Sequence, residues 1–256
     1  MIPIFIGRDK REDIAWHVLA HSLITRSSIP LALTAVGNDT VHPWLWWRER
    51  GEKDSTDFSN ARFIVPALMN FGGWAIFMDC DMVCLGDIAD LWAQRDDRYA
   101  VMVVKHQHTP AEQTKFLGAT QSAYQRKNWS SLMMFNCSHN SCWELLPNYV
   151  NTAHGLDLHG FKWCKDKEIG EIKGLWNVLV AQGYQHPEPV LDKGDIKLLH
   201  YTIGGGWHGY EPDGGEYWKQ EFEALLAANN PCANVRLHNT EPGRLSFAGC
   251  YQRIDP

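Results

Sequence analysis

The chain has 256 residues, of which 45% are hydrophobic and 21% are charged, a balance that excludes an intrinsically disordered protein and suits one large globular domain. Its formal net charge of −6 argues against sequence-independent binding to nucleic acid, which needs a cationic surface. No uncharged stretch is long enough to cross a bilayer, so no transmembrane segment is expected, while peripheral contact with a membrane stays open.

Strands and helices are predicted to alternate along the first hundred residues. Short apolar runs predict strands over Ile2–Ile6, Leu31–Val36 and Trp74–Met78. Periodic apolar residues predict a helix over Asp13–Arg26, and a second helix over Asn60–Phe71 is expected to stop at the glycine pair that follows it. This order is typical of an α/β fold with a mainly parallel central sheet flanked by helices.

The second half of the chain continues the pattern less regularly. Its predicted elements are strands at Ala100–Val104, Ser131–Phe135 and Lys197–Tyr201 and a helix at Glu216–Ala228. The polar segment 106–127 is expected to form an irregular loop that is either mobile or faces the acceptor. We predict a single catalytic domain over residues 1–229, with an irregular tail over residues 230–256 packed on it.

The seven cysteines show neither the spacing of a disulfide framework nor a CxxC pair. Free thiols in a reducing compartment are the simplest interpretation, so a cytoplasmic location is predicted. The N-terminal run Met1–Gly7 carries no basic segment and meets charge at Arg8, which does not fit a signal peptide.

Two carboxylates after the third predicted strand carry the sharpest functional signal. Asp79 and Asp81 are separated by one residue, so in an extended chain both side chains point the same way and can face one ion. Ligands of open α/β sheets bind beyond the carboxyl ends of strands, where carboxylates are costly unless they bind a cation or solvent. A bare DxD is more often a pair of solvated turn residues, but the apolar strand before it and the Gly86–Ile88 turn after it favour a metal site.

The segment FMDCDMVCLGDI, residues 77–88, resembles the DxD segment of family 8 glycosyltransferases, which include glycogenin and lipopolysaccharide galactosyltransferases. Those enzymes have a GT-A fold, use Mn²⁺ and retain the anomeric configuration of the donor sugar. Further segments fit in the same order over about residues 2–208. The resemblance implies a GT-A fold and transfer of a sugar from a nucleotide-sugar, with a UDP-sugar as the expected donor and Mn²⁺, or less effectively Mg²⁺, as the cofactor.

The same resemblance assigns the first donor contacts. Ile6, Gly7 and Asp9 are similar to the segment that holds the base and ribose, although Asp9 is nearly as well suited to cap the next helix. Arg62 resembles a basic residue that reaches the diphosphate, although an exposed helix arginine is the commoner case.

Further donor contacts follow from later segments. Ser130 and Ser131 resemble the strand that lines the donor sugar, and Trp207 resembles an aromatic residue that stacks on the donor. Gly205 stands near the place of a phosphate-binding lysine, where backbone N–H groups of a glycine loop can bind phosphate instead. Cys80 belongs to the donor-contact segment with Asp79, but its own side chain is expected to point away.

The reacting groups complete the assignment. Asp166-Lys167-Glu168 is similar to an acidic segment beside the reacting sugar, so Asp166 or Glu168 is expected to stabilise the oxocarbenium character of the sugar or to hold its hydroxyls. The family usually has glutamine where Lys167 stands. The segment 199–202 resembles the motif that supplies a metal-binding histidine, which makes His200 the third ligand beside Asp79 and Asp81.

Two other functional classes stay open at this point. A nucleotidyltransferase or phosphohydrolase also uses paired carboxylates on a strand. The 12 tryptophans suit a non-catalytic carbohydrate-binding protein, because aromatic rings stack on sugars. The expected partners are a nucleotide-sugar and a carbohydrate, glycolipid or protein acceptor, and the sequence names neither the sugar nor the acceptor.

Overall fold

The computed structural model describes residues 1–52, 54–108, 126–180, 184–209 and 214–229. A six-stranded sheet in the order β2-β1-β3-β7-β5-β8 forms the centre of the molecule. Its strands are β1 Ile2–Gly7, β2 Leu31–Val36, β3 Trp74–Met78, β5 Val101–Val103, β7 Leu132–Asn136 and β8 Ile169–Glu171. The predicted tail, residues 230–256, and most of the predicted loop, residues 109–125, lie outside the described residues.

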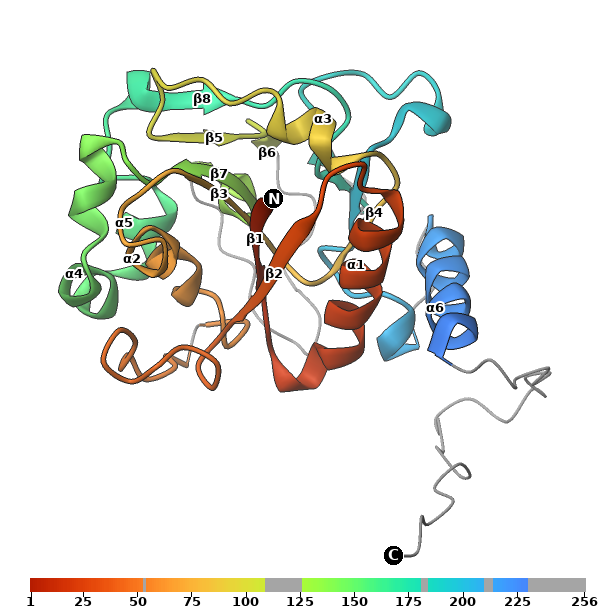
Figure 1. Cartoon of the computed structure of the whole chain (residues 1–256), viewed down its shortest axis with the longest axis horizontal. Helices are drawn as coiled ribbons and strands as arrows, with labels where there is room; N and C mark the ends of the chain where they lie inside the picture. Colours follow the sequence, from red (N-terminus) through yellow and green to blue (C-terminus); the bar gives the residue numbers. More distant parts are fainter. Residues whose placement is uncertain (53, 109–125, 181–183, 210–213, 230–256) are drawn as a thin grey trace, which may run out of the picture.

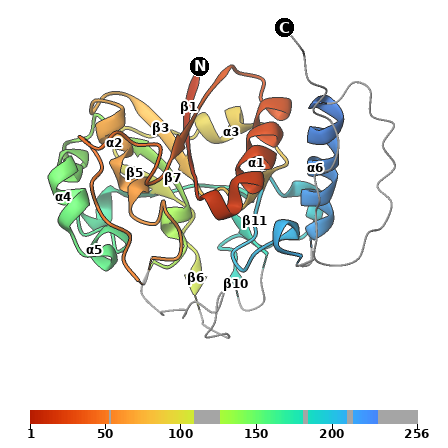
Figure 2. The ribbon, with the colours of Figure 1, turned by 90° about the horizontal axis from the view of Figure 1, so that it is seen from below.

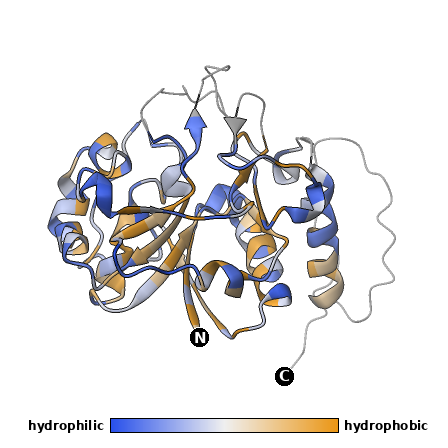
Figure 3. Cartoon of the chain, turned by 90° about the horizontal axis from the view of Figure 1, so that it is seen from above, coloured by the Kyte–Doolittle hydropathy of each residue, from blue (hydrophilic) through white to orange (hydrophobic). Residues whose placement is uncertain are grey.

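The central sheet is mainly parallel, as predicted. β1 is parallel to both β2 and β3, and β5 is parallel to β8, while β7 runs antiparallel to its neighbours β3 and β5. Buried strands of this kind need apolar residues on both faces, which explains the continuous apolar runs of β1 and β3. In Figure 3 the central strands are coloured mostly as hydrophobic.

Helices cover the sheet on both sides. Figures 1 and 2 show α1 (Asp13–Arg26) and α6 (Gly215–Asn229) on one side, and α2 (Val65–Leu68), α4 (Pro147–Thr152) and α5 (Gly155–His159) on the other. The short α3 (Ile88–Trp92) follows Asp87, whose side chain caps its amino end. The mixed α/β order therefore agrees with the expected fold class. Among the described residues, no helix is long and apolar enough to span a bilayer.

A second, smaller sheet lies beside α1, and the sequence did not predict that it is separate from the central sheet. It has the order β4-β11-β9, with β4 at Met82–Cys84, β9 at Val178–Leu179 and β11 at Leu198–His200. A separate two-stranded ribbon pairs β6 (Gln107–His108) with β10 (Tyr184–Gln185). The predicted strand at 197–201 is thus real but does not belong to the central sheet.

The predicted helix over Asn60–Phe71 is wrong in length. The chain forms a 3-10 turn, η2 (Ala61–Ile64), followed by the single turn of α2. Pro66 sits in the first turn of α2, where its missing N–H is tolerated. A helix that began earlier could not continue through it, because proline cannot donate the next backbone hydrogen bond. Asn70 and Phe71 have φ values of 49° and 53°, so the backbone leaves the helical region before the glycine pair.

Candidate metal and donor site at the carboxyl end of β3

The DxD residues lie in the link between the two sheets. β3 of the central sheet ends at Met78, and β4 of the smaller sheet begins at Met82. β11 pairs antiparallel with β4, which places His200 opposite Met82, and the Tyr201 N–H donates to the Asp81 carbonyl at 2.8 Å. His200 therefore reaches the DxD by pairing with the strand that follows it, and not from a neighbouring strand of the central sheet.

Asp79, Asp81 and His200 converge into one cluster. One ligand atom from each residue lies within 4.8 Å of the others. His200 Nε2 is 3.2 Å from Asp81 Oδ1 and 4.0 Å from Asp79 Oδ2. The His200 side chain is 3% exposed and the two carboxylates are 14% and 18% exposed, so the cluster is largely removed from bulk water.

A chain of hydrogen bonds fixes the tautomer of His200. The Ser131 hydroxyl donates to the Asn128 carbonyl at 2.6 Å, so its oxygen accepts from Asn177 Nδ2 at 3.0 Å. The Asn177 Oδ1 atom then faces His200 Nδ1 at 2.9 Å, and an amide oxygen can only accept. In the neutral imidazole, His200 Nδ1 therefore carries the proton, and the lone pair of Nε2 points toward the carboxylates.

This arrangement fits a divalent cation. A lone pair on His200 Nε2 faces carboxylate oxygens, and Asp81 Oδ1 is buried without a hydrogen bond from any described residue. Electron pairs that face one another out of water are costly unless a positive charge lies between them. An imidazole whose other nitrogen donates to a carbonyl-type oxygen is also the usual second-shell pattern of a metal-binding histidine. The donor set is two carboxylates and one neutral imidazole.

Arg62 is neither an exposed helix residue nor free to reach a ligand. Its side chain is 7% exposed, and its Nη1 lies 2.8 Å from Asp79 Oδ1 and donates to the Ser130 carbonyl at 2.9 Å. The guanidinium also lies over the rings of Phe58 and Phe77, 5.3 and 5.1 Å from their centroids. Arg62 thus holds Asp79 in place and offsets part of the negative charge of the cluster.

Other predicted donor residues line the same strand end but bind within the protein. Ile6 is buried and pairs in register with Met78, one residue before the DxD. A Cβ on Gly7 would meet the Phe58 ring at 2.3 Å, so glycine is needed for this packing. Cys80 is fully buried and donates weakly to Glu12 Oε2 at 3.8 Å.

The two predicted serines support the cluster from β7's amino end. Ser130 is buried, and its hydroxyl lies 2.7 Å from His159 Nδ1. The Ser131 carbonyl accepts from the Asp79 N–H at 2.9 Å, while its hydroxyl belongs to the chain that orients His200. Both serines therefore position the functional side chains.

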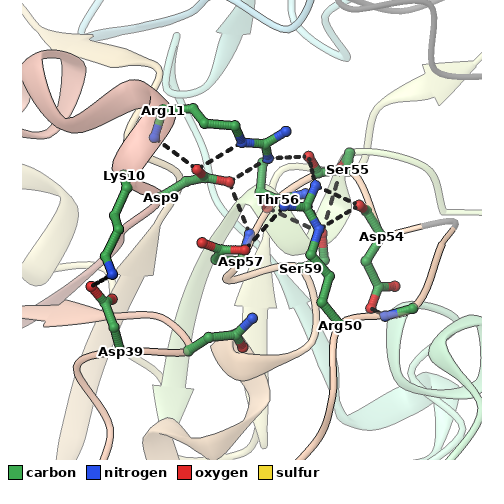
Figure 4. Close-up of polar contacts among 12 residues, drawn as sticks. Asp9, Lys10, Arg11, Asp39, Arg50, Asp54, Ser55, Thr56, Asp57 and Ser59 are labelled. Atoms are coloured by element: carbon green, nitrogen blue, oxygen red, sulfur yellow. Dashed lines mark hydrogen bonds and ion pairs between the residues drawn. The ribbon is translucent and has the colours of Figure 1, made fainter.

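Asp9 is 1% exposed and works as the cap of η1 (Lys10–Glu12), as the alternative interpretation had it. Its carboxylate accepts from the Arg11 guanidinium, from the Arg11 N–H at 2.9 Å and from the Asp57 N–H at 3.0 Å (Figure 4). Burial on its own would raise the pKa of Asp9, but these bonds lower it below its ordinary value. The side chain ties β1 to the loop before η2 and is occupied by protein donors.

Gly205 and Trp207 lie in the turn after β11. A Cβ on Gly205 would meet the Trp207 ring at 2.3 Å, so the glycine allows the indole to fold back on its own loop. The Trp207 ring packs edge-on against the Tyr201 ring, and its centroid lies 5.3 Å from the ring centroid of Trp218 in α6. Its Nε1 is buried and donates no hydrogen bond to any described residue.

Asp166 and Glu168 are not brought to the cluster. They form η6, at the amino end of β8, where the Ala100 N–H donates to the Glu168 carbonyl. Following the register across the sheet, Glu168 lies level with Trp74, five residues before Asp79, or about 16 Å along the strand direction. Asp166 is 85% exposed and pairs with Arg126 at 2.6 Å.

Two residues near the cluster were not assigned a role from the sequence. Asn177, at the end of the segment that resembles the acidic motif, orients His200, and its φ of 55° is one that asparagine tolerates. Glu12 lies beside Cys80, and its Oε1 is 3.5 Å from His208 Nε2 of η8 (Gly206–His208). Both contacts join segments far apart in the chain, so no local pattern could have revealed them.

A scan against models of known protein families finds no match. Among curated proteins, the chain is 44% identical to Protein CDI of Arabidopsis thaliana over 229 residues, which is 88% of each chain.

Solved structures with a similar fold are glycosyltransferases. GlyE of Streptococcus pneumoniae matches with a TM-score of 0.58 and 12% identity, covering 89% of this chain and 63% of GlyE. The galactosyltransferase LgtC, solved with donor and acceptor sugar analogues, matches with a TM-score of 0.54 and 12% identity over 88% of this chain and 96% of its own. The bifunctional WbbM matches with a TM-score of 0.54 and 13% identity over 86% of this chain, which spans about half of WbbM, 49%. These likenesses establish the GT-A fold.

Proposed function

The chain belongs to the same protein family as Arabidopsis Protein CDI and has the GT-A fold, and from this premise we propose that it is a metal-dependent glycosyltransferase. The observation that carries the proposal is the convergence of Asp79, Asp81 and His200 just beyond the carboxyl end of β3. This is where open α/β sheets bind their ligands. The substrates would be a nucleotide-sugar and an acceptor hydroxyl.

Mixed oxygen and nitrogen ligands of this kind suit Mn²⁺ better than Ca²⁺, with Mg²⁺ as a poorer substitute. When bound, the cation would stabilise the negative charge that develops on the departing diphosphate. The protein's own part is preorganisation. Arg62 holds Asp79, Asn177 fixes the tautomer of His200, and both supporting side chains are buried, so the three ligands need little reordering.

The proposal also covers the donor, the stereochemistry of transfer and the cellular location. A UDP-sugar is proposed because the first-strand segment, with Ile6, Gly7 and Asp9, resembles a uridine pocket. Retention of the anomeric configuration rests on the resemblance to family 8. A cytoplasmic location is proposed from the five described cysteines, all of which are free.

The test is a panel of sugar nucleotides. Thermal unfolding is followed with UDP, GDP and CMP, each with Mn²⁺ or with EDTA, because a ligand that binds the native state stabilises it by mass action. We expect UDP with Mn²⁺ to protect and the other two nucleotides to protect less. Turnover of UDP-sugars is then measured with added acceptors, and NMR of the product linkage reports the anomeric configuration.

The rival classes give different results in the same experiments. Phosphate release from simple esters without use of a sugar nucleotide would assign the site to a phosphohydrolase. Binding of glycans without turnover of any sugar nucleotide would assign the chain to the non-catalytic carbohydrate-binding proteins. Equal protection by all three nucleotides would reject the choice of uridine, and an inverted product would reject retention.

A further inference from the structure

Apart from the metal cluster, the structure has a hollow at the opposite end of the central sheet. Its volume is about 560 Å³, and it is open to solvent. It forms where β3 begins and β7 ends, because Trp74 pairs in register with Asn136. The side chains that line it are Trp74, Asp97, Asn136, Ser138, His139 and Asn140.

An aromatic ring provides flat apolar surface at this hollow. The Trp74 indole lines it and is held by a hydrogen bond from Nε1 to Asp97 Oδ1 at 3.0 Å. Because this bond holds the ring in place, the indole can offer its flat face to a ligand without being reordered.

Polar groups with unused hydrogen-bonding capacity line the same hollow. Asn136 is 6% exposed, its Nδ2 reaches only the Asp97 carbonyl at 3.5 Å, and its Oδ1 accepts no hydrogen bond from the described residues. His139 Nδ1 accepts from the Ser141 N–H at 3.1 Å, so the neutral ring carries its proton on Nε2. The hollow thus offers an amide, a carboxylate and an imidazole to one ligand.

The lining of the hollow disfavours anions. No lysine or arginine is among its lining residues, and the Asp97 carboxylate belongs to the wall. Glu168, behind that wall, is paired with Lys165 at 3.8 Å. Phosphates, nucleotides and uronates are therefore disfavoured by the Asp97 carboxylate, because like charges repel. A ligand with a flat apolar face and many neutral hydroxyls matches both the Trp74 ring and the polar groups.

We propose that this hollow is a second binding site, for a neutral oligosaccharide. Its register level is that of Trp74, five residues and about 16 Å before Asp79, so a sugar bound there is not the reacting sugar. The inference goes beyond the proposed transfer reaction, because it concerns a separate surface that needs neither metal nor nucleotide. It gives Glu168 a place in the structure as support of this wall.

The test is isothermal titration calorimetry of the whole chain, in EDTA and without nucleotide. The probes are linear hexasaccharides of glucose, galactose, mannose and xylose, with hexagalacturonate as the charged counterpart. At least one neutral probe is expected to bind, and Trp74→Ala and Asp97→Ala should each weaken it about tenfold. The matched control is Trp44→Ala, which removes an indole that is 83% exposed outside the hollow and should leave the Kd unchanged.

Two results would overturn the proposal. One is that none of the four neutral hexasaccharides binds. The other is that binding is the same in Trp74→Ala, Asp97→Ala and Trp44→Ala, which would put the sugar elsewhere on the molecule. Hexagalacturonate that binds as tightly as the neutral probe would reject the argument from charge. Thermal unfolding of each variant checks that it is folded. Because no nucleotide is present, failure to find sugar transfer does not affect the result.

Discussion

The two ends of β3 differ in burial and in charge. At its carboxyl end, Asp79 and Asp81 are mostly buried and are held by Arg62 and by the pairing of β4 with β11. At its amino end, Trp74 and Asp97 lie on an open hollow. Buried, converging charges are costly and persist only where the structure supports them, so they indicate chemistry. Exposed rings and hydroxyl-binding groups cost little and suit reversible binding.

Removing Arg62 should have the largest effect on the molecule. Arg62→Ala leaves the Asp79 carboxylate without its buried partner, and breaking such a pair costs about 3 kcal/mol of unfolding free energy or more. Urea unfolding measures this loss. The control is Arg98→Ala, whose ion pair with Asp96 lies on the surface, so no measurable change is expected. Equal stability of both variants would show that Arg62 does not hold the cluster.

Asp81→Asn should abolish most of the activity while leaving the fold intact. The substitution keeps the size of the side chain and removes its charge, so turnover should fall by at least about 10²-fold, as for the loss of one strong electrostatic stabiliser. Turnover of the UDP-sugar in Mn²⁺ is the measurement, and EDTA should reproduce the loss in the unaltered protein. Activity that survives both changes contradicts the metal site and most of the proposed function.

Asn177 tests whether the tautomer of His200 matters. Asn177→Gly keeps a residue that tolerates the φ of 55° but removes the acceptor of the His200 Nδ1 proton. The Mn²⁺ concentration needed for half-maximal activity should rise about tenfold, the usual cost of losing a second-shell partner. Asn177→Asp, which keeps an oxygen at that place, should stay closer to the unaltered protein. Identical Mn²⁺ titrations of all three proteins would reject the positioning role.

Asp9 gives a pH signature at the carboxyl end. Its pKa is lowered in the folded protein from the ordinary 3.8, so its contribution to stability is present above that pH and is lost as the pH falls through the folded value. Asp9→Asn keeps a cap but loses the charge that pairs with Arg11. The variant should be less stable at pH 7, and the difference should shrink below pH 3.8. Urea unfolding at several pH values tests this, and a constant difference would contradict it.

Local patterns in the sequence predicted much of this fold. The bounds of β2 and β3 agree with the prediction because each strand is a single apolar run. The bounds of α1 agree because its apolar residues recur with the period of a helix. The DxD and His200 were predicted from short motifs, and the cluster they form is present. The sequence could not show how His200 reaches the DxD. It lies on β11 of a separate sheet, and pairing between strands more than a hundred residues apart has no local sequence pattern.

The acidic segment should show the smallest effect on turnover. Asp166-Lys167-Glu168 was placed beside the reacting sugar by its resemblance to the acidic segment of family 8, but the register of β5 and β8 puts Glu168 at the amino end of β8. Glu168 accepts from Ser141 and from the Lys165 N–H, and these bonds, the backbone one first, lower its pKa. A carboxylate used in this way supports a turn.

Asp166→Asn and Glu168→Gln should therefore leave kcat for the UDP-sugar within about twofold, the range of ordinary substitutions away from a functional feature. The comparison with Asp81→Asn is direct, because all three changes replace a carboxylate by its amide and differ mainly in place. A fall of tenfold or more in either variant, with the fold intact, would mean that the acidic segment reaches the sugar after all. The sheet register would then have to change, since it keeps Asp79, just after β3, and Glu168, just before β8, about 16 Å apart along the strand direction.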